Sequence, residues 1–139
     1  MTDRESAEAL VAALGHERAE PCGDRTLFVH QHGPHAGRLV IPCDHIEADT
    51  RRYYSHVMYS DDHGASWHLG GRSPRDGVNE CQVVELADGR LLLNMRNYDR
   101  SQTARKVSLS ENGGATWGEL YADPALIEPI CQASVRRYS

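Results

Sequence analysis

Ser60-Asp61-Asp62-His63-Gly64-Ala65-Ser66-Trp67 returns fifty residues later as Ser110-Glu111-Asn112-Gly113-Gly114-Ala115-Thr116-Trp117. Each copy begins with a serine, has an Asp or Asn at its third position and a Gly at its fifth, and ends on a tryptophan. This composition is typical of a tight turn between strands, because Asp and Asn side chains bond neighbouring backbone N–H groups and Gly accepts a positive φ. The tryptophan that follows is expected to bury its ring between sheets.

The repeat period indicates an antiparallel β-propeller, whose blades are four-stranded sheets of similar length. A closed propeller needs about four to eight blades, so the 139 residues hold only two to three blades. The predicted fold class is therefore all-β, a partial propeller preceded by a short helical or disordered leader. The expected domains are a leader at 1–24 and a partial propeller at 25–139. Strand composition places the strands at Tyr54–Ser60, Glu80–Leu86, Arg90–Arg96, Arg105–Ser110, Trp117–Tyr121 and Gln132–Val135.

A hairpin is predicted around Asp88-Gly89, a dipeptide that favours a two-residue turn. With that turn, Leu86 pairs with Arg90, and Glu80 faces Arg96 across the two strands. The chain then returns through Arg105–Ser110, so both tryptophan turns are expected at the end of the sheet opposite to Glu80 and Arg96. From spacing alone, such a pair is most often a cross-strand ion pair.

The two turns resemble the Asp-box, Ser-x-Asp-x-Gly-x-Thr-Trp, with Asn112 in place of Asp in the second copy and Ser66 in place of Thr in the first. Three further segments resemble exo-α-sialidases: Asn79–Leu86 with Gly89–Asn97, Gly37–Pro42, and Glu128–Gln132. The resemblance implies a six-bladed propeller of which this chain is a central fragment. In such boxes the residues support the fold and do not catalyse. They are Ser60, Asp62, Gly64, Ser66, Trp67, Ser110, Asn112, Gly114, Thr116 and Trp117.

The resemblance implies a retaining hydrolase that removes terminal sialic acid from oligosaccharides, glycoproteins or gangliosides, without a metal or other cofactor. Glu80 matches the glutamate that activates a tyrosine nucleophile, and Arg96 matches one of three arginines that bind the substrate carboxylate. The acid, the nucleophile and two arginines are expected outside this chain, which alone should be inactive. The alternatives are a non-catalytic Asp-box module that binds protein or glycan, and a truncated product without function.

One blade departs from the family pattern. Only His35-Ala36 separates Gly33-Pro34 from Gly37, where relatives have a whole inner strand and a turn. Either 26–32 takes the place of that strand, or the blade is damaged.

Charge and hydropathy argue against two kinds of partner, nucleic acid and the membrane interior. The net charge is −5, and the basic residues never cluster beyond pairs such as Arg136-Arg137, so nucleic acid is not expected to bind. No segment approaches the ~20 apolar residues that a membrane span needs. The first residues carry no export signal, which makes the cytoplasm the default compartment although the sequence does not fix it.

The four cysteines, Cys22, Cys43, Cys81 and Cys131, lie far apart and are predicted to be reduced core residues. A metal site built from Cys43 and His30, His32, His35 and His45 is a weak alternative, because the spacing fits no known zinc pattern. These histidines are predicted to lie in turns and on the surface.

Overall fold

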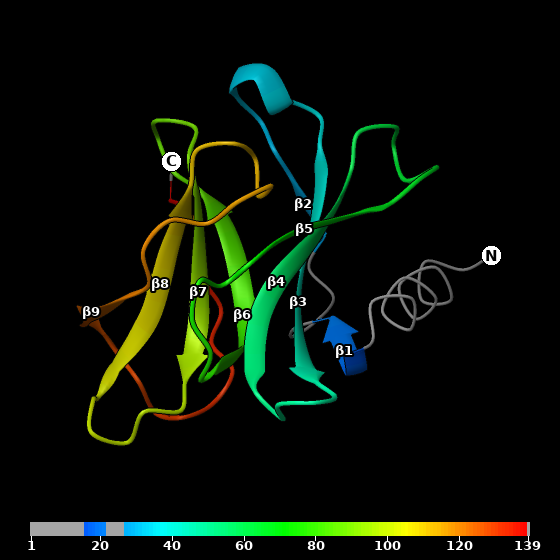
Figure 1. The fold of residues 1–139 in the computed structure, drawn as a ribbon. Helices are drawn as coiled ribbons and strands as arrows, with labels where there is room; N and C mark the ends of the chain where they lie inside the picture. The colour runs from blue at the N-terminus through cyan, green and yellow to red at the C-terminus, as the bar shows by residue number, and fades with distance from the viewer. Residues whose placement is uncertain (1–15, 22–26, 139) are drawn as a thin grey trace.

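The computed structural model describes residues 16–21 and 27–138, which form two antiparallel sheets and a single 3-10 turn, η1 (Gly33–His35) (Figure 1). The first sheet has the order β1-β3-β4-β5, with β2 also paired to β3. The second has the order β6-β7-β8-β9. This arrangement confirms the all-β class and corresponds to two blades of a propeller.

The first sheet is built on β3 (Leu39–Glu47), β4 (Tyr53–Ser60) and β5 (His68–Arg72). On the side of β3 that does not pair with β4, its two ends pair with different short strands. β1 (His16–Pro21) runs along Cys43–Glu47, and β2 (Phe28–Val29) pairs with Val40 and Leu39. Two separate segments thus pair with this edge of β3, and Phe28–Val29 is the part of 27–32 that does so.

β1 lies inside the segment that the sequence assigned to a leader. Residues 16–21 form a strand, whereas a helix or disorder was expected. The rest of that segment, 1–15 and 22–24, lies outside the described residues, and the domain boundary at residue 24 remains a prediction.

The second sheet comprises β6 (Val78–Glu85), β7 (Leu91–Asn97), β8 (Ala104–Ser110) and β9 (Tyr121–Ile127). The predicted strand at Trp117–Tyr121 is wrong, because β9 begins only at Tyr121 and 117–120 form an irregular segment that also bonds outside its own sheet. The Gly118 N–H still donates to the Leu109 carbonyl of β8 (2.8 Å). The indole N–H of Trp117 donates to the Gly71 carbonyl (2.9 Å), and Arg75 donates to the Leu120 carbonyl (2.6 Å). The predicted strand at Gln132–Val135 is also absent. Gln132, Ser134 and Val135 instead line a pocket beside β6.

The core lies between the sheets, with β6 against β3 and β4. Val40 and Val57 of the first sheet are fully buried, as are Leu91, Leu93 and Met95 of the second. The last three alternate along β7, as expected of a strand with one face on the core.

Both tryptophan turns adopt the same hydrogen-bonded structure. In the first, the Ser60 hydroxyl donates to Asp62 (2.8 Å) and accepts from the Gly64 N–H (2.8 Å), while Asp62 accepts from the Ser66 N–H (2.8 Å). The second repeats these bonds from Ser110 to Asn112, from Gly114 to Ser110, and from Thr116 to Asn112. Gly64 and Gly114 have the same φ of 89°. Asn112 therefore replaces Asp62 without changing the turn.

Arg38, which directly precedes β3, and Gly71 of β5 bind the two turns and so join the sheets. The Arg38 guanidinium binds Asp61 through Nε (2.7 Å) and Nη2 (2.8 Å), and its Nη1 donates to the Gly113 carbonyl (3.1 Å). The Gly71 N–H donates to the Gly114 carbonyl (2.8 Å), and a Cβ on Gly71 would lie 2.8 Å from another backbone oxygen. This close approach leaves room only for glycine at that position.

The two tryptophans differ in burial. Trp117 is buried between the sheets, as predicted. Trp67 is half-buried, and its indole N–H has no hydrogen-bond partner among the residues that the structure describes.

A buried carboxylate provides a second connection between the sheets. Glu85 accepts hydrogen bonds from the backbone N–H groups of Gln31 (2.8 Å) and His32 (2.9 Å) and from the His32 ring (2.9 Å). Nε2 of His30 lies 3.3 Å from the same carboxylate. Burial raises the pKa of Glu85, but the hydrogen bonds from Gln31 and His32 and the charge of His30 together hold it below its ordinary value.

Three predictions about cysteines and histidines need correction. Cys43 and Cys81 are buried as predicted, but Cys131 is exposed. His30 and His45 are buried, not superficial, since each packs against another histidine ring. Cys22 lies outside the described residues.

Candidate active site

Glu80 and Arg96 meet at one end of the second sheet. The Leu86 N–H donates to the Arg90 carbonyl (2.8 Å), as the predicted turn requires. Cys81 pairs with Met95 and Val78 with Asn97, and a register shift between these two pairs leaves Glu80 and Arg96 on facing strands at an irregular step. Nη1 of Arg96 donates to Oε2 of Glu80 over 2.8 Å.

The two turns lie at the other end of the sheets. Ser110 pairs with Leu91 at the start of β7, whereas Arg96 stands near its end. Ser60 pairs with Leu39 at the matching end of the first sheet. The register therefore confirms that the boxes and the Glu80–Arg96 pair occupy opposite ends.

The ion pair is partly open to solvent, with 35% of the Glu80 side chain and 23% of the Arg96 side chain exposed. The hydrogen bond to Glu80 raises the pKa of Arg96 above its ordinary value, against the opposing effect of burial. Glu80 uses one of the five N–H donors of the guanidinium. Arg96 can therefore also bind a second anion while it holds Glu80.

An aromatic pair from both sheets lies beside Arg96. The guanidinium carbon sits 5.1 Å from the centre of the Tyr98 ring, and Tyr98 stacks on Tyr53 of β4 with ring centres 5.4 Å apart. The Tyr98 hydroxyl accepts a hydrogen bond from Asn79 (3.0 Å). Sequence reasoning missed these residues, because their contact depends on how two sheets pack.

A buried ionic cluster lies behind the same strand end. Arg105 of β8 pairs with Glu128 (3.1 Å) and donates from Nε to Asn94 (2.6 Å). Glu128 also accepts the backbone N–H of Asn97 (3.0 Å), the residue after Arg96. Burial lowers the pKa of Arg105, and the charge of Glu128 opposes that effect. Glu128 thus anchors the C-terminal segment to the end of β7, a role that its motif alone did not predict.

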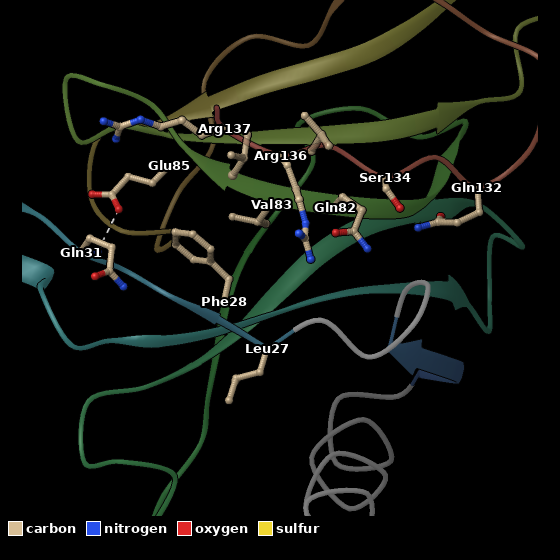
Figure 2. A pocket seen from close by; sticks show the side chains of 12 residues that line it. Leu27, Phe28, Gln31, Gln82, Val83, Glu85, Gln132, Ser134, Arg136 and Arg137 are labelled. Carbon is tan, nitrogen blue, oxygen red and sulfur yellow. Dashed lines mark hydrogen bonds between the residues drawn. The ribbon is translucent and has the colours of Figure 1, made fainter. Parts of the chain in front are cut away.

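A cavity of about 620 Å³ lies along β6 but includes neither Glu80 nor Arg96. Apolar side chains such as Phe28 and Val83 line it, together with the polar Gln82, Gln132 and Arg136; Figure 2 shows them around the cavity. Gln82 is two residues from Glu80 in the same strand. The cavity is therefore a neighbour of the predicted site, not the site itself.

Residues 16–21 and 27–138 contain neither a candidate metal cluster nor a candidate membrane-spanning helix. No cluster of three or more His, Cys, Asp or Glu side chains there could hold a metal ion. No helix within the same ranges is long and apolar enough to cross a membrane.

Comparison with known proteins identifies the family. Residues 19–131 match the family model described as BNR repeat-like domain. The chain is 41% identical over 107 residues to a sialidase of Micromonospora viridifaciens, covering 77% of this chain and 16% of that protein. It is 30% identical over 109 residues to mouse Sialidase-4, covering 72% of this chain and 23% of that protein.

Solved structures agree with these matches. The Hadza microbial sialidase Hz136 superposes with a TM-score of 0.59 at 35% identity, covering 69% of this chain and 18% of that one. An intramolecular trans-sialidase from Ruminococcus gnavus gives a TM-score of 0.57 at 28% identity, covering 73% and 20%. The chain thus spans about a sixth to a quarter of the curated relatives compared above. It belongs to the BNR repeat-like domain family and resembles part of a sialidase.

Proposed function

We propose that this chain supplies part of the active site of an exo-α-sialidase, which hydrolyses terminal α-linked sialic acid from oligosaccharides, glycoproteins or gangliosides with retention of configuration. The observation that carries the proposal is the Glu80–Arg96 pair, 2.8 Å apart at the strand end that the Asp-boxes leave free. A module that used its boxes only for folding would not need this pair.

Sialic acid carries a carboxylate on its anomeric carbon, so a carboxylate nucleophile would approach an adjacent negative charge. A tyrosine attacks as a neutral group, and sialidases are exceptions to the two-carboxylate scheme for this reason. The tyrosine phenol has a pKa of about 10 and needs a base within hydrogen-bond reach. Glu80 is proposed as that base, acting on a tyrosine from the rest of the propeller.

Arg96 is proposed to bind the substrate carboxylate. A guanidinium presents two parallel N–H donors to a planar carboxylate, a geometry that lysine does not reproduce. The proton donor and two further arginines would come from other blades, so the isolated chain is expected to show no sialidase turnover.

A chimera tests the proposal. The segment of the Micromonospora sialidase that matches this chain would be replaced by residues 28–137, and release of a fluorophore from a sialoside would be measured. The isolated chain serves as the inactive control. The proposal predicts turnover by the chimera that disappears in Arg96→Ala but persists in Arg100→Ala, an exposed arginine near the same strand end. A folded chimera without turnover would contradict it.

A further inference from the structure

Arg96 is fixed by two contacts of different kinds. Glu80 accepts one N–H through an ordinary charge-assisted hydrogen bond (2.8 Å). Tyr98 faces the guanidinium carbon at 5.1 Å, within the range of a cation–π interaction. The ring contact consumes no N–H donor, so it can orient the guanidinium and leave its other donors free for a ligand. The Nε atom is buried and has no hydrogen-bond partner among the described residues.

Tyr98 is itself held in place from two directions. Asn79 donates to its hydroxyl over 3.0 Å, which fixes the far end of the side chain. Tyr53 stacks on its ring at an interplanar angle of 28°. Tyr53 belongs to β4 of the first sheet, and Tyr98 directly follows β7 of the second. The orientation of the Tyr98 ring therefore depends on the packing of one blade against the next.

We propose that Tyr98, supported by Tyr53, is a positioning residue that orients the Arg96 guanidinium for a planar carboxylate. The ring restricts rotation of the guanidinium, while Glu80 holds only one of its nitrogens. The proposal rests on the proposed function for the identity of the carboxylate, which would be that of sialic acid. Through this stack, the first sheet influences the site by way of Tyr98 and Arg96.

The isolated chain allows a direct test. In ¹⁵N-labelled protein, the Nε–Hε signal of Arg96 is assigned by its loss in Arg96→Lys, and its order parameter is measured by relaxation. We expect a value in the rigid range, about 0.85 on the backbone scale. Tyr98→Leu should lower it toward about 0.6, whereas Tyr98→Phe, which keeps the ring, should preserve most of the order.

Matched controls separate positioning from general destabilisation. Tyr121→Leu alters a tyrosine of β9 that is 43% exposed, close to the 39% of Tyr53, and should leave the Arg96 signal unchanged. Tyr53→Leu should lower the Arg96 order parameter, though less than Tyr98→Leu does. If Tyr98→Leu fails to fold, Tyr53→Leu decides the question. The proposal would be overturned if the Arg96 order parameter in Tyr98→Leu and Tyr53→Leu were as high as in Tyr121→Leu. It would also be overturned if Tyr98→Leu and Tyr98→Phe lowered that order parameter equally.

The two proposals can fail separately. In the chimera, Tyr98→Leu should raise KM for the sialoside by about three- to tenfold, the range for a partly desolvated cation–π contact, with a smaller change in kcat. Loss of Arg96 order in the chain, combined with an inactive wild-type chimera, would contradict only the proposed function. An active chimera whose KM does not respond to Tyr98→Leu, with Arg96 order unchanged, would contradict only the positioning role.

Discussion

Nη1 of Arg96 lies 2.8 Å from Oε2 of Glu80 across the β6–β7 hairpin, and both side chains are partly exposed at the end of the sheet that carries no Asp-box. A buried structural ion pair would exclude other ligands, whereas this one leaves guanidinium donors and a carboxylate oxygen open. The contact links the fold to the proposed chemistry, because the β6–β7 hairpin brings the two residues together at the register shift between Val78 and Cys81.

Arg38 should stabilise the contact between the blades more than its counterpart in the second blade. Arg38→Lys removes the paired hydrogen bonds to Asp61 and the bond to the Gly113 carbonyl, and should lower the free energy of unfolding by about 1–3 kcal/mol. Arg90 follows Gly89 as Arg38 follows Gly37, but it pairs with the nearby, half-exposed Asp88. Arg90→Lys should therefore change stability much less than Arg38→Lys in the same urea titration. Equal losses of unfolding free energy in Arg38→Lys and Arg90→Lys would contradict this prediction.

The first Asp-box should be sensitive to acid, and the second should not. Hydrogen bonds from Ser66 and Ser60 lower the pKa of Asp62 to about 2, whereas Asn112 holds the second box without an ionisable group. A lowered folded-state pKa gives stability that is present above the unfolded value, about 3.9, and is lost as pH falls toward about 2. Asp62→Asn should reduce the loss of stability in this window. Parallel pH profiles of variant and wild type, from thermal melts, would contradict the prediction.

Glu85 should connect the β6–β7 hairpin to the loop after β2. Glu85→Gln replaces a carboxylate that accepts from Gln31 and His32, and should cost about 1.5–3 kcal/mol at neutral pH. Because the folded-state pKa of Glu85 is lowered, the wild type should lose this advantage as pH falls below about 4.3. Denaturant titrations at pH 7 and pH 3 would measure the difference, with the exposed Glu111→Gln as the control. A difference that stays constant between the two pH values would exclude this role.

The sequence predicted the features that depend on local rules. The Asp88-Gly89 turn and strand alternation placed Glu80 opposite Arg96, and the repeated boxes defined the turns and the blade period. It failed where long-range packing decides the structure. Residues 117–120 were predicted as a strand, but the Trp117 indole bonds to Gly71 of β5 and the Leu120 carbonyl to Arg75 in the loop after β5.

The surroundings of the site were not predictable for the same reason. Tyr53 and Tyr98 meet only because β4 packs beside β6, and Arg105 reaches Glu128 across 23 residues. No single strand or hairpin dictates the spacing of Tyr53 and Tyr98, and the Arg105–Glu128 contact depends on an irregular register between β8 and β9. The sequence left open whether 26–32 replaces the missing strand or the blade is damaged. It did not indicate that β1 and β2 would each pair with a different part of β3.

The central claim is that Glu80 acts in the chemical step, and kcat of the Glu80→Gln chimera tests it most directly. Gln keeps an oxygen that accepts from Arg96 but is not a base, so kcat should fall by about 10²–10⁴-fold with little change in ground-state binding. Glu111→Gln, which removes a carboxylate at the opposite end, should leave kcat unchanged. If Glu80→Gln retains near-normal kcat, the pair is a cross-strand ion pair and the catalytic assignment is wrong.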